Sequence, residues 1–578
     1  MPGKPSAATV IPGVAALRSY RPGYLRQDIV AGLILTALLV PQGMAYAELA
    51  GLPPITGLYT SILCLAGYAV SGPSKVLVLG PDSALGPMIA ACIIPLVAAN
   101  GDPGKAVAYA SMLALMVGGI TVLAGVFKLG FVADLLSKPT QIGYMNGLAL
   151  TIIIGQLPKL FGFSVDGDGL IAETAEWVSG VVNGLTVPAA LAIGVGSLIL
   201  ILAFQRWLPR VPGVLVAVVL AILAVSLFNL TDRGVKVVGS LPERFPPFTV
   251  PIVPLSDLLL LFAGALGIAL VSLTDTISTS SAFAARSGEQ VDGNKEMIGI
   301  GAANIAAGFF QGFPISTSGS RTAVAWQNGA KTQVTGLVGA AAILLLLLFA
   351  PGLLKNLPQP TLAAVVIAAS LSLADIPAMR RLWLQRKSDF ALAMAAFLGV
   401  ALLGVLPGIG LAVALSILDV FSRVWRPYQS VLGKVEGLAG YHDVEGYPSA
   451  EYLPGLVIYR FNSPLFFANA NTFRDKVMQL AAAEPRPTWI LVAAESIIDI
   501  DTTAADMLED LDVKLNAAGT SLVFAEMSTQ VREKVERYEL DEVITAEFFP
   551  TITKAVHAYQ EKTGASWTPR PEPSAPAE

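Results

Sequence analysis

The chain has 578 residues, of which 54% are hydrophobic and only 14% are charged, and its mean hydropathy is +0.65. Soluble globular proteins carry about 25% charged residues, so this composition excludes an ordinary soluble protein and indicates one that spans a membrane. The net charge is −5. The chain has two cysteines, which is too few for a disulfide framework. Its two histidines both lie after residue 431, which excludes a cysteine–histidine metal site in the apolar region.

The charge divides the chain near residue 431. Residues before this point carry a net charge of +6, and those from 431 onward carry −11. Neither part has the basic patch of a nucleic-acid-binding protein. We therefore predict four regions, which are a cytoplasmic N-terminal segment over 1–25, a transmembrane domain over 26–428, a cytoplasmic domain over 429–563 and a disordered, proline-rich tail over 564–578.

Long apolar segments recur through the membrane region. A helix that crosses a bilayer needs about 20 apolar residues. About twelve segments approach this length, namely 28–50, 54–72, 104–127, 139–160, 188–206, 211–229, 255–285, 296–313, 332–350, 358–375, 388–406 and 408–426. Two shorter, interrupted segments, 83–98 and 318–330, bring the expected total to about fourteen passes.

Basic residues at the ends of these segments predict the orientation. Cytoplasmic loops of membrane proteins carry an excess of lysine and arginine. Placing Arg18, Arg21 and Arg26 inside also places the other basic loops inside, and it puts the loop with Glu173 and Glu176 outside. Both termini are then expected in the cytoplasm.

The two short segments predict an inverted repeat. If the membrane region is divided near residue 245, each half has about seven passes and the short segment is third in each. An odd number of passes inverts the second half relative to the first. Both short helices would begin near the middle of the bilayer, where their N–H groups and positive dipole ends favour an anion.

The second short helix begins in a polar stretch, "FPISTSGSRTAV" over 313–324. Its Ser316, Thr317, Ser318 and Ser320 supply hydroxyl groups, and Arg321 supplies a full positive charge. A charge at this depth is costly without a partner, so we expect Arg321 to compensate a substrate anion. It could instead reach an interface or form a structural ion pair.

Asp275 is an acid within a long apolar segment, "IALVSLTDTISTSSAFAAR". Carboxylates inside the membrane are candidate proton carriers. Asp275 and Asp82 are also the two candidate partners for a structural ion pair with Arg321. Asp275 with Thr279 could instead hold a cation such as sodium, and the sequence leaves this possibility open.

The region after residue 431 alternates strand and helix patterns. The segments 455–461, 489–496 and 521–527 read as strands, and 469–483 and 502–518 read as helices. This alternation is typical of a small α/β domain.

Several motifs resemble the sulfate permease family of anion transporters, which includes pendrin and prestin. "VPQGMAYAELAGLPPITGLYTS" (40–61) resembles the first-helix signature of that family, and "LGPDSA" (79–84) resembles the start of its third helix. Residues 283–324 are similar to the bacterial branch, and "DIDTTAADMLEDL" (499–511) is similar to its regulatory STAS domain. The resemblance covers about residues 15–560.

The resemblance implies an architecture. It implies an α-helical polytopic membrane protein with fourteen transmembrane segments as seven-plus-seven inverted repeats, followed by a small cytoplasmic α/β STAS domain. A core bundle would move against a gate bundle in an elevator mechanism, within a homodimer in the bacterial plasma (inner) membrane.

The resemblance also implies the site. By motif position, the substrate-binding residues are expected to be Gln42, Tyr46, Ala84, Leu85, Ser318, Gly319, Ser320 and Arg321, with Ala84 and Leu85 contributing backbone. Asp275 falls where proton-coupled members carry an acid. Thr503 falls where soluble relatives carry a phosphorylated serine, but an ordinary position near a helix start, capped by Asp501, also fits this sequence.

The predicted function is proton-coupled transport of a small, sulfate-like anion without any cofactor. The sequence also leaves room for a sodium-coupled bicarbonate importer, a C4-dicarboxylate transporter, a passive anion exchanger or channel, and a carrier of a neutral nucleobase. Arg321 argues against the last of these. The expected partners are the anion, protons or sodium, the lipid bilayer, a second copy of the chain and a cytosolic regulator of the STAS domain. The sequence contains no metal-ligand cluster and no cofactor-binding loop of the kind that would indicate an enzyme.

Overall fold

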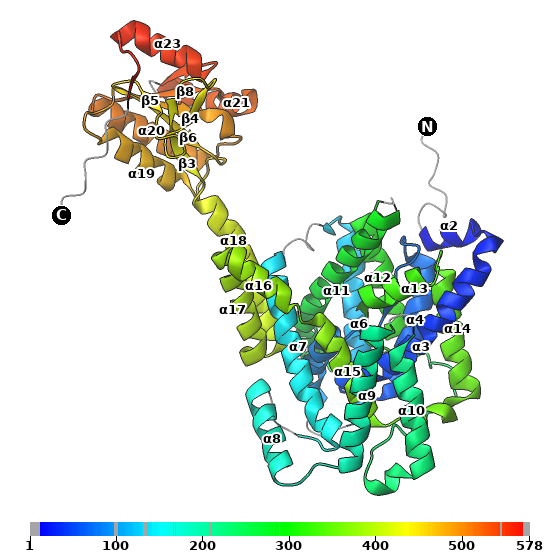
Figure 1. Ribbon diagram of the computed structural model, residues 1–578. Coiled ribbons are helices and arrows are strands. Elements are labelled where there is room, and N and C mark those ends of the chain that lie inside the picture. Colours follow the sequence, from blue (N-terminus) through cyan, green and yellow to red (C-terminus); the bar gives the residue numbers. More distant parts are fainter. Residues whose placement is uncertain are drawn as a thin grey trace. The chain divides into compact units, whose positions relative to one another are not determined.

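The structure is a computed structural model that describes residues 12–97, 102–130, 136–165, 167, 169–208, 211–287, 290–543 and 546–569. The chain forms two compact units, Met1–Ile417 and Leu418–Glu578 (Figure 1). The division falls inside the last membrane helix, slightly before the boundary at 428 that the sequence predicts. Residues 1–11 of the predicted N-terminal segment and residues 570–578 of the predicted tail lie outside the described residues.

The first unit is helical. Its first half comprises α2 (Pro12–Arg18), α3 (Leu25–Leu49), α4 (Pro54–Ser71), α5 (Leu85–Val97), α6 (Pro103–Val126), α7 (Lys138–Phe161), α8 (Leu170–Val182), α9 (Pro188–Trp207) and α10 (Gly213–Phe228). Its second half comprises α11 (Leu258–Ser287), α12 (Gly293–Gly308), α13 (Gly319–Gln327), α14 (Val334–Phe349), α15 (Gln359–Leu373), α16 (Ile376–Gln385), α17 (Lys387–Leu403) and α18 (Val405–Trp425).

Each predicted membrane segment coincides with one of these helices. Among the described residues, seven helical stretches are long and apolar enough to cross a membrane by themselves, and α5, α10 and α14 are shorter apolar helices. The sequence analysis missed α8 and α16. Both are short helices with charged residues, so they do not match the pattern of a continuous apolar span.

Local sequence explains where several helices begin and how closely they pack. Pro54, Pro103 and Pro188 each occupy the first position of a helix, where no N–H group is needed. A side chain at Gly57 would place its Cβ only 1.9 Å from the carbonyl oxygen of Gly43, so α3 and α4 cross at a distance that requires glycine.

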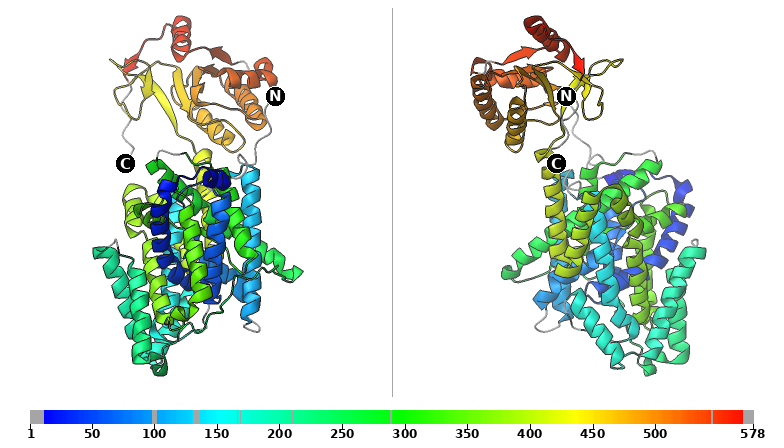
Figure 2. Two further views of the ribbon diagram at one scale, coloured as in Figure 1. Left: turned by 90° about the vertical axis from the view of Figure 1, so that its right-hand side faces the viewer. Right: turned by 60° about the vertical axis from the view of Figure 1, so that its left-hand side comes forward.

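The helix contacts follow an inverted repeat. If α3–α7, α9 and α10 are matched in order with α11–α15, α17 and α18, most contacts have a counterpart. The pair α4 and α14 matches α12 and α6, the pair α3 and α14 matches α11 and α6, and the pair α7 and α17 matches α15 and α9. The blue helices of the first half therefore interlace with the green helices of the second, as the two views in Figure 2 also show.

The two short helices approach each other through their leading strands. The strand β1 (Leu79–Gly80) precedes α5 and pairs antiparallel with β2 (Ser316–Thr317), which precedes α13. The backbone N–H of Ser318 also donates to the carbonyl of Val78 over 3.1 Å. The predicted meeting of the two half-helices is confirmed.

The second unit is an α/β domain around one sheet. Its strands are β3 (Gln429–Lys434), β4 (Tyr441–Asp443), β5 (Glu451–Tyr452), β6 (Leu456–Phe461), β7 (Trp489–Ala493), β8 (Ser521–Ala525), β9 (Glu547–Phe549) and β10 (Thr568–Pro569). Its helices are α19 (Ala470–Ala481), α20 (Thr502–Ala517), α21 (Thr529–Arg537), α22 (Leu540–Val543) and α23 (Ile552–Thr563).

The sheet order is β10-β5-β3-β6-β7-β8-β9, with β4 beside β3, and β6 to β9 run parallel. Separate apolar clusters cover the two faces of this sheet, so every residue of β7 is buried. The predicted strands and helices of this domain are confirmed. One difference is that β10 lies within the segment 564–578 that the sequence predicts to be disordered, because Thr568 and Pro569 pair with β5.

Candidate functional site

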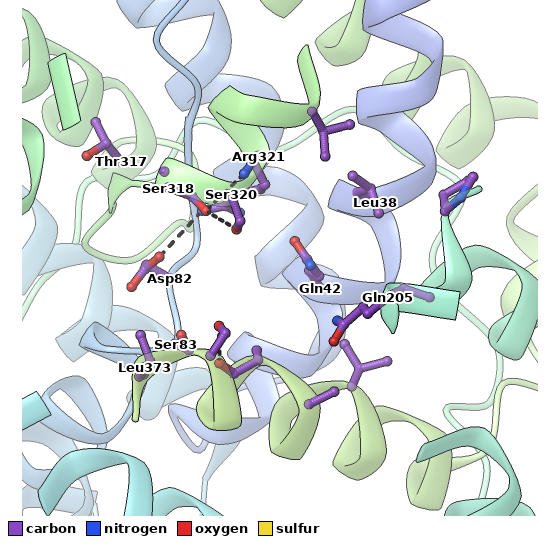
Figure 3. Close-up of a pocket in the computed structure, with 18 of the residues that line it drawn as sticks. Leu38, Gln42, Asp82, Ser83, Gln205, Thr317, Ser318, Ser320, Arg321 and Leu373 are labelled. Atoms are coloured by element: carbon purple, nitrogen blue, oxygen red, sulfur yellow. Dashed lines mark hydrogen bonds and ion pairs between the residues drawn. The ribbon is translucent and has the colours of Figure 1, made fainter. Parts of the chain in front are cut away.

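A cavity of about 940 Å³ lies in the first unit where the two half-helices meet (Figure 3). Its walls come from α3, α7, α11 and α15, from the tips of α5 and α13, and from residues at the end of α9 and the start of α10. The predicted residues that line it are Gln42, Tyr46, Asp275, Thr279, Ser318, Gly319, Ser320 and Arg321.

Helical spacing explains why these residues share the cavity. Leu38, Gln42 and Tyr46 recur every four residues on α3 and therefore lie on one face of it. On α11, Asp275 and Thr279 have the same spacing. Each helix thus presents a polar stripe within an otherwise apolar sequence.

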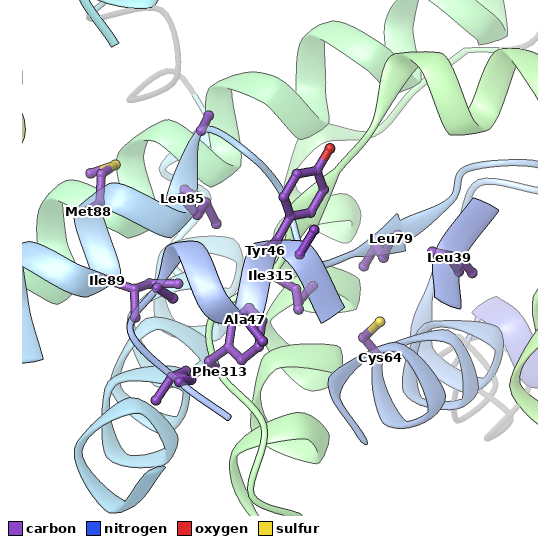
Figure 4. Close-up of a cluster of buried hydrophobic side chains, with 14 of the residues drawn as sticks. Leu39, Tyr46, Ala47, Cys64, Leu79, Leu85, Met88, Ile89, Phe313 and Ile315 are labelled. Carbon is purple, nitrogen blue, oxygen red and sulfur yellow. The ribbon is translucent and has the colours of Figure 1, made fainter. Parts of the chain in front are cut away.

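The other two predicted residues, Ala84 and Leu85, do not line the cavity with their side chains. Leu85 is fully buried and packs in an apolar cluster with Met88 and Ile89 (Figure 4). Their neighbours Asp82 and Ser83 line the cavity instead. The sequence analysis weighed Asp82 only as an ion-pair partner and missed Ser83. The preference of aspartate for helix N-caps was the available signal.

The tip of α13 is open to a ligand. Ser318 caps this helix, since its Oγ accepts a hydrogen bond from the N–H of Arg321 over 3.4 Å and lies 3.1 Å from the Oγ of Ser320. Gly319 and Ser320 follow at the first two helical positions and are exposed. The first N–H groups of a helix have no partner within it, so this tip offers donors and a positive dipole end.

The tip of α5 differs because it carries its own carboxylate. One oxygen of Asp82 accepts a hydrogen bond from the N–H of Ala84 over 2.9 Å. A negative charge at a helix N-terminus offsets the positive dipole end. The prediction of two positive tips is therefore refined, because among the described residues the tip of α5 carries a carboxylate whereas the tip of α13 is capped by the neutral Ser318.

Arg321 is buried between the two tips. Its side chain is 2% exposed, and one of its terminal nitrogens lies 3.7 Å from a carboxylate oxygen of Asp82. Within the described structure, both terminal nitrogens of Arg321 and the hydroxyl groups of Ser316 and Thr317 have no hydrogen-bond partner. Buried polar groups are nearly always paired, so this cluster is suited to a ligand that brings acceptor oxygens.

Asp275 stands apart from Arg321. Among the described residues it has neither an ion pair nor a hydrogen bond, so a fixed Asp275–Arg321 pair is not formed. The charged side chains among the described lining residues are then one cation, Arg321, and two carboxylates, Asp82 and Asp275. If both carboxylates are ionised, the side-chain charge is negative and opposes an anion.

Comparison with known proteins identifies the family. Residues 25–396 match the sulfate permease family. This chain belongs to the sulfate permease family. Residues 447–555 of this family member match the STAS domain, which corresponds to the second compact unit.

Named relatives of this sulfate permease family member are transporters. A protein named probable sulfate transporter from Mycobacterium tuberculosis is 41% identical over 553 residues, which cover 95% of this chain and 98% of the relative. Sulfate transporter 1.3 of Arabidopsis thaliana is 30% identical, with coverage of 96% and 88%. These names agree with the prediction of a transporter rather than an enzyme.

Solved structures support the fold. Murine solute carrier 26 family member A9, an anion transporter solved in the inward-facing state, has a TM-score of 0.88 at 24% identity over 97% of this chain and 96% of that chain. The transmembrane domain of a cyanobacterial bicarbonate transporter has a TM-score of 0.60 at 22% identity, with coverage of 68% and 98%. The polytopic helical fold followed by a STAS domain is thus confirmed.

Thr503 of this sulfate permease family member lies in the second unit, near the start of α20. Asp501 caps this helix by accepting a hydrogen bond from the N–H of Ala504 over 2.8 Å, and it also accepts one from the N–H of Phe467 over 2.9 Å. The reading of Asp501 as the cap is confirmed. Thr503 is exposed, and its phosphorylation stays a prediction.

Proposed function

We propose that this chain is a secondary active transporter that carries a small oxyanion, with sulfate as the first candidate, together with protons across the bacterial plasma (inner) membrane. The observation that carries the proposal is the buried guanidinium of Arg321, whose terminal nitrogens have no hydrogen-bond partner in the described structure beside the open tip of α13. The sulfate transporters among its relatives support the choice of anion.

The anion would be held by groups that converge on the cavity. Arg321 would supply the charge, and Ser318, Gly319 and Ser320 would supply hydroxyl and N–H donors. Gln42 and Tyr46 would contact the anion from α3, and the backbone of Ala84 and Leu85 would close the side formed by α5. A bound oxyanion would satisfy donors that otherwise lie buried without partners.

Proton coupling follows from the charges that line the cavity. With Asp82 and Asp275 both ionised, the single positive charge of Arg321 is outweighed. Each proton taken up by a carboxylate makes the side-chain charge more favourable to an anion by one unit. Asp275 is the proposed coupling site, because it has no fixed hydrogen-bond or ion-pair partner among the described residues that would hold its charge in place.

An elevator movement is supported by a difference between the helix contacts of the two repeats. The helix α3 packs against α10 and α15, whereas its counterpart α11 has no comparable contact with α18 and α7. The cavity also reaches Gln205 and Leu373, at the ends of α9 and α15. Arg206 lies beside the first of these residues in sequence, and Arg380 and Arg381 of α16 follow the second. Under the predicted orientation this end is cytoplasmic, so the cavity would open to the cytoplasm in an inward-facing state. The proposal also places both termini in the cytoplasm and has a core bundle move within a homodimer. The STAS domain would then face a cytosolic regulator.

Uptake into proteoliposomes tests this function. Labelled sulfate should accumulate when the interior is alkaline relative to the outside, and Asp275→Asn should abolish the accumulation. The matched control is Glu48→Gln, which changes an acid of α3 that does not line the cavity. Accumulation by Asp275→Asn equal to that of the unmodified chain would remove the coupling proposal.

A sodium-coupled bicarbonate importer is the second candidate. It is favoured by the position of Thr279, whose Oγ1 would lie 3.9 Å from a Cβ added at Gly319, and by the fold shared with a cyanobacterial bicarbonate transporter. Asp275 and Thr279 would then hold the cation. Uptake that requires sodium at fixed pH would select this candidate. Competition by a C4-dicarboxylate would indicate a dicarboxylate transporter, and counterflow without accumulation would indicate a passive exchanger or channel.

A further inference from the structure

Asp82 is a carboxylate that is built into the candidate anion site. Its carboxyl group combines two interactions that an incoming anion would make, since it lies at the N-terminus of a half-helix and beside the guanidinium of Arg321. One oxygen accepts from the N–H of Ala84 over 2.9 Å, and the other lies 3.7 Å from Arg321 (Figure 3).

We propose that Asp82 is an internal counter-anion, which holds Arg321 while the site is empty and must take up a proton before the guanidinium binds a transported anion. This inference rests on the proposed function. It adds a second proton-binding residue, distinct from Asp275, and it makes the anion compete with a side chain of the protein.

The geometry distinguishes this role from that of a structural ion pair. A stable buried pair needs short, well-directed hydrogen bonds, most often bidentate for arginine. The separation of 3.7 Å exceeds a hydrogen bond, and the terminal nitrogens of Arg321 have no hydrogen-bond partner in the described structure. The two groups are therefore close enough to neutralise each other and too far apart to satisfy each other.

The accessibility of Asp82 also favours its replacement by an anion beside Arg321. The side chain of Asp82 is 14% exposed and lines the cavity, whereas that of Arg321 is 2% exposed. The carboxylate is thus the more accessible member, where protons and ligands arrive. Among the described residues, the charged and titratable groups that interact with it electrostatically are Arg321, Asp275, Tyr46 and Tyr144.

The binding equilibrium can be written as a balanced step. A proton from solution binds the carboxylate of Asp82, its ionic interaction with Arg321 is lost, and the anion takes the position beside the guanidinium. The anion and the proton are released together when the step reverses. No covalent bond to the anion forms or breaks.

Sulfate binding to the full-length chain in detergent tests this step. Sulfate affinity is measured by calorimetry between about pH 5.5 and about pH 8.5, in buffers of different ionisation enthalpy, so that proton uptake is read directly. In Asp82→Asn, sulfate should bind at least about tenfold more tightly at the alkaline limit, with about one fewer proton taken up per sulfate. Asp82→Glu should retain proton uptake.

Folding is controlled within the same experiment. Asparagine is as good an N-cap as aspartate, so Asp82→Asn should keep the start of α5, and thermal unfolding verifies this. If Asp82→Asn instead weakens sulfate binding at every pH, or leaves proton uptake unchanged, the counter-anion role is overturned and Asp82 only positions Arg321.

The result is separable from the proposed function. If the unmodified chain binds no sulfate at any pH, both ideas fail together. If Asp275→Asn still accumulates sulfate, only the coupling role of Asp275 fails. A lower proton uptake in Asp82→Asn alone, with Asp275 intact, supports the counter-anion role of Asp82.

Discussion

Two carboxylates in the membrane unit are buried in very different ways. Asp28, near the start of α3, is fully buried and accepts five hydrogen bonds. Asp275 faces the cavity and has no hydrogen-bond or ion-pair partner among the described residues. The donors to Asp28 are the N–H of Lys331, the N–H and hydroxyl of Thr332, and the hydroxyl groups of Thr335 and Tyr20. The number of fixed donors thus separates an acid that joins helices from one that is available to a ligand.

The largest effect on stability is expected from Asp28→Ala. It would leave three part-buried donors of the α13–α14 connection and the buried hydroxyl of Thr335 without this acceptor, so we expect a loss of stability of about 2–5 kcal/mol. Equilibrium unfolding in mixed detergent micelles measures it. Asp275→Ala is the matched change and should alter stability by less than about 0.5 kcal/mol. Equal losses in the two variants would contradict the contrast between the two acids.

The second-largest effect is expected from a change at Arg321, and it concerns sulfate affinity rather than stability. Arg321→Gln removes a guanidinium whose terminal nitrogens have no hydrogen-bond partner in the described structure, and sulfate affinity should fall by at least about a hundredfold. Calorimetry measures the affinity, and the unfolding midpoint should change little. Arg244→Gln is the control, because Arg244 contacts Tyr59 and does not line the cavity. An equal loss of affinity in the control would argue against a local role for Arg321.

A smaller loss of stability is expected when only one of the hydrogen bonds to Asp28 is removed. Thr335→Val preserves the shape of the side chain but removes one hydroxyl donor to Asp28, which acts over 3.0 Å. The remaining four donors stay in place, so the expected loss is about 1 kcal/mol. The same unfolding assay applies. A loss as large as that of Asp28→Ala would show that this single bond dominates the cluster.

The smallest effect is expected at an exposed carboxylate of the STAS domain. The hydroxyl of Tyr428 donates to Asp443, and this hydrogen bond, with a further one from the N–H of Glu445, holds the pKa of Asp443 below its ordinary value. The folded chain then binds fewer protons than the unfolded chain at acidic pH. The resulting stability is present above about pH 4 and is lost as the pH falls below it.

Tyr428→Phe should therefore weaken the acid sensitivity of this unit slightly. The carboxyl titration of Asp443 can be followed by nuclear magnetic resonance, and its midpoint should rise toward the ordinary value in the variant. An unchanged midpoint would assign the shift to the backbone donor of Glu445.

Much of the fold was predictable because the length of an apolar segment is a strong signal for a membrane helix. The predicted segment 54–72 became α4 (Pro54–Ser71), and 104–127 became α6 (Pro103–Val126). The prolines and glycines that interrupt the third segment of each half also predicted the half-helices. The strands β1 and β2 were not predicted, because two residues give no periodicity and their partners lie far apart in the sequence.

The candidate site was predictable in its charges and less so in its pairings. Arg321, Asp275, Gln42 and Tyr46 were chosen correctly as residues that share one cavity. Which acid lies beside Arg321 depends on tertiary geometry, so Asp82 and Asp275 could not be separated from the sequence. Asp28 was missed altogether, because an acid near a basic helix end reads as an ordinary membrane flank.

The pairing of β1 with β2 has a consequence for the order in which anions are preferred during transport. Its backbone hydrogen bonds lie in buried surroundings, where an unpaired N–H or carbonyl group is costly, so the tips of α5 and α13 should remain joined during the proposed movement of the helices. A solute arriving from either face of the bilayer then meets the same set of donors. The order in which competing anions are preferred should consequently be identical for influx and efflux, even where the two rates differ.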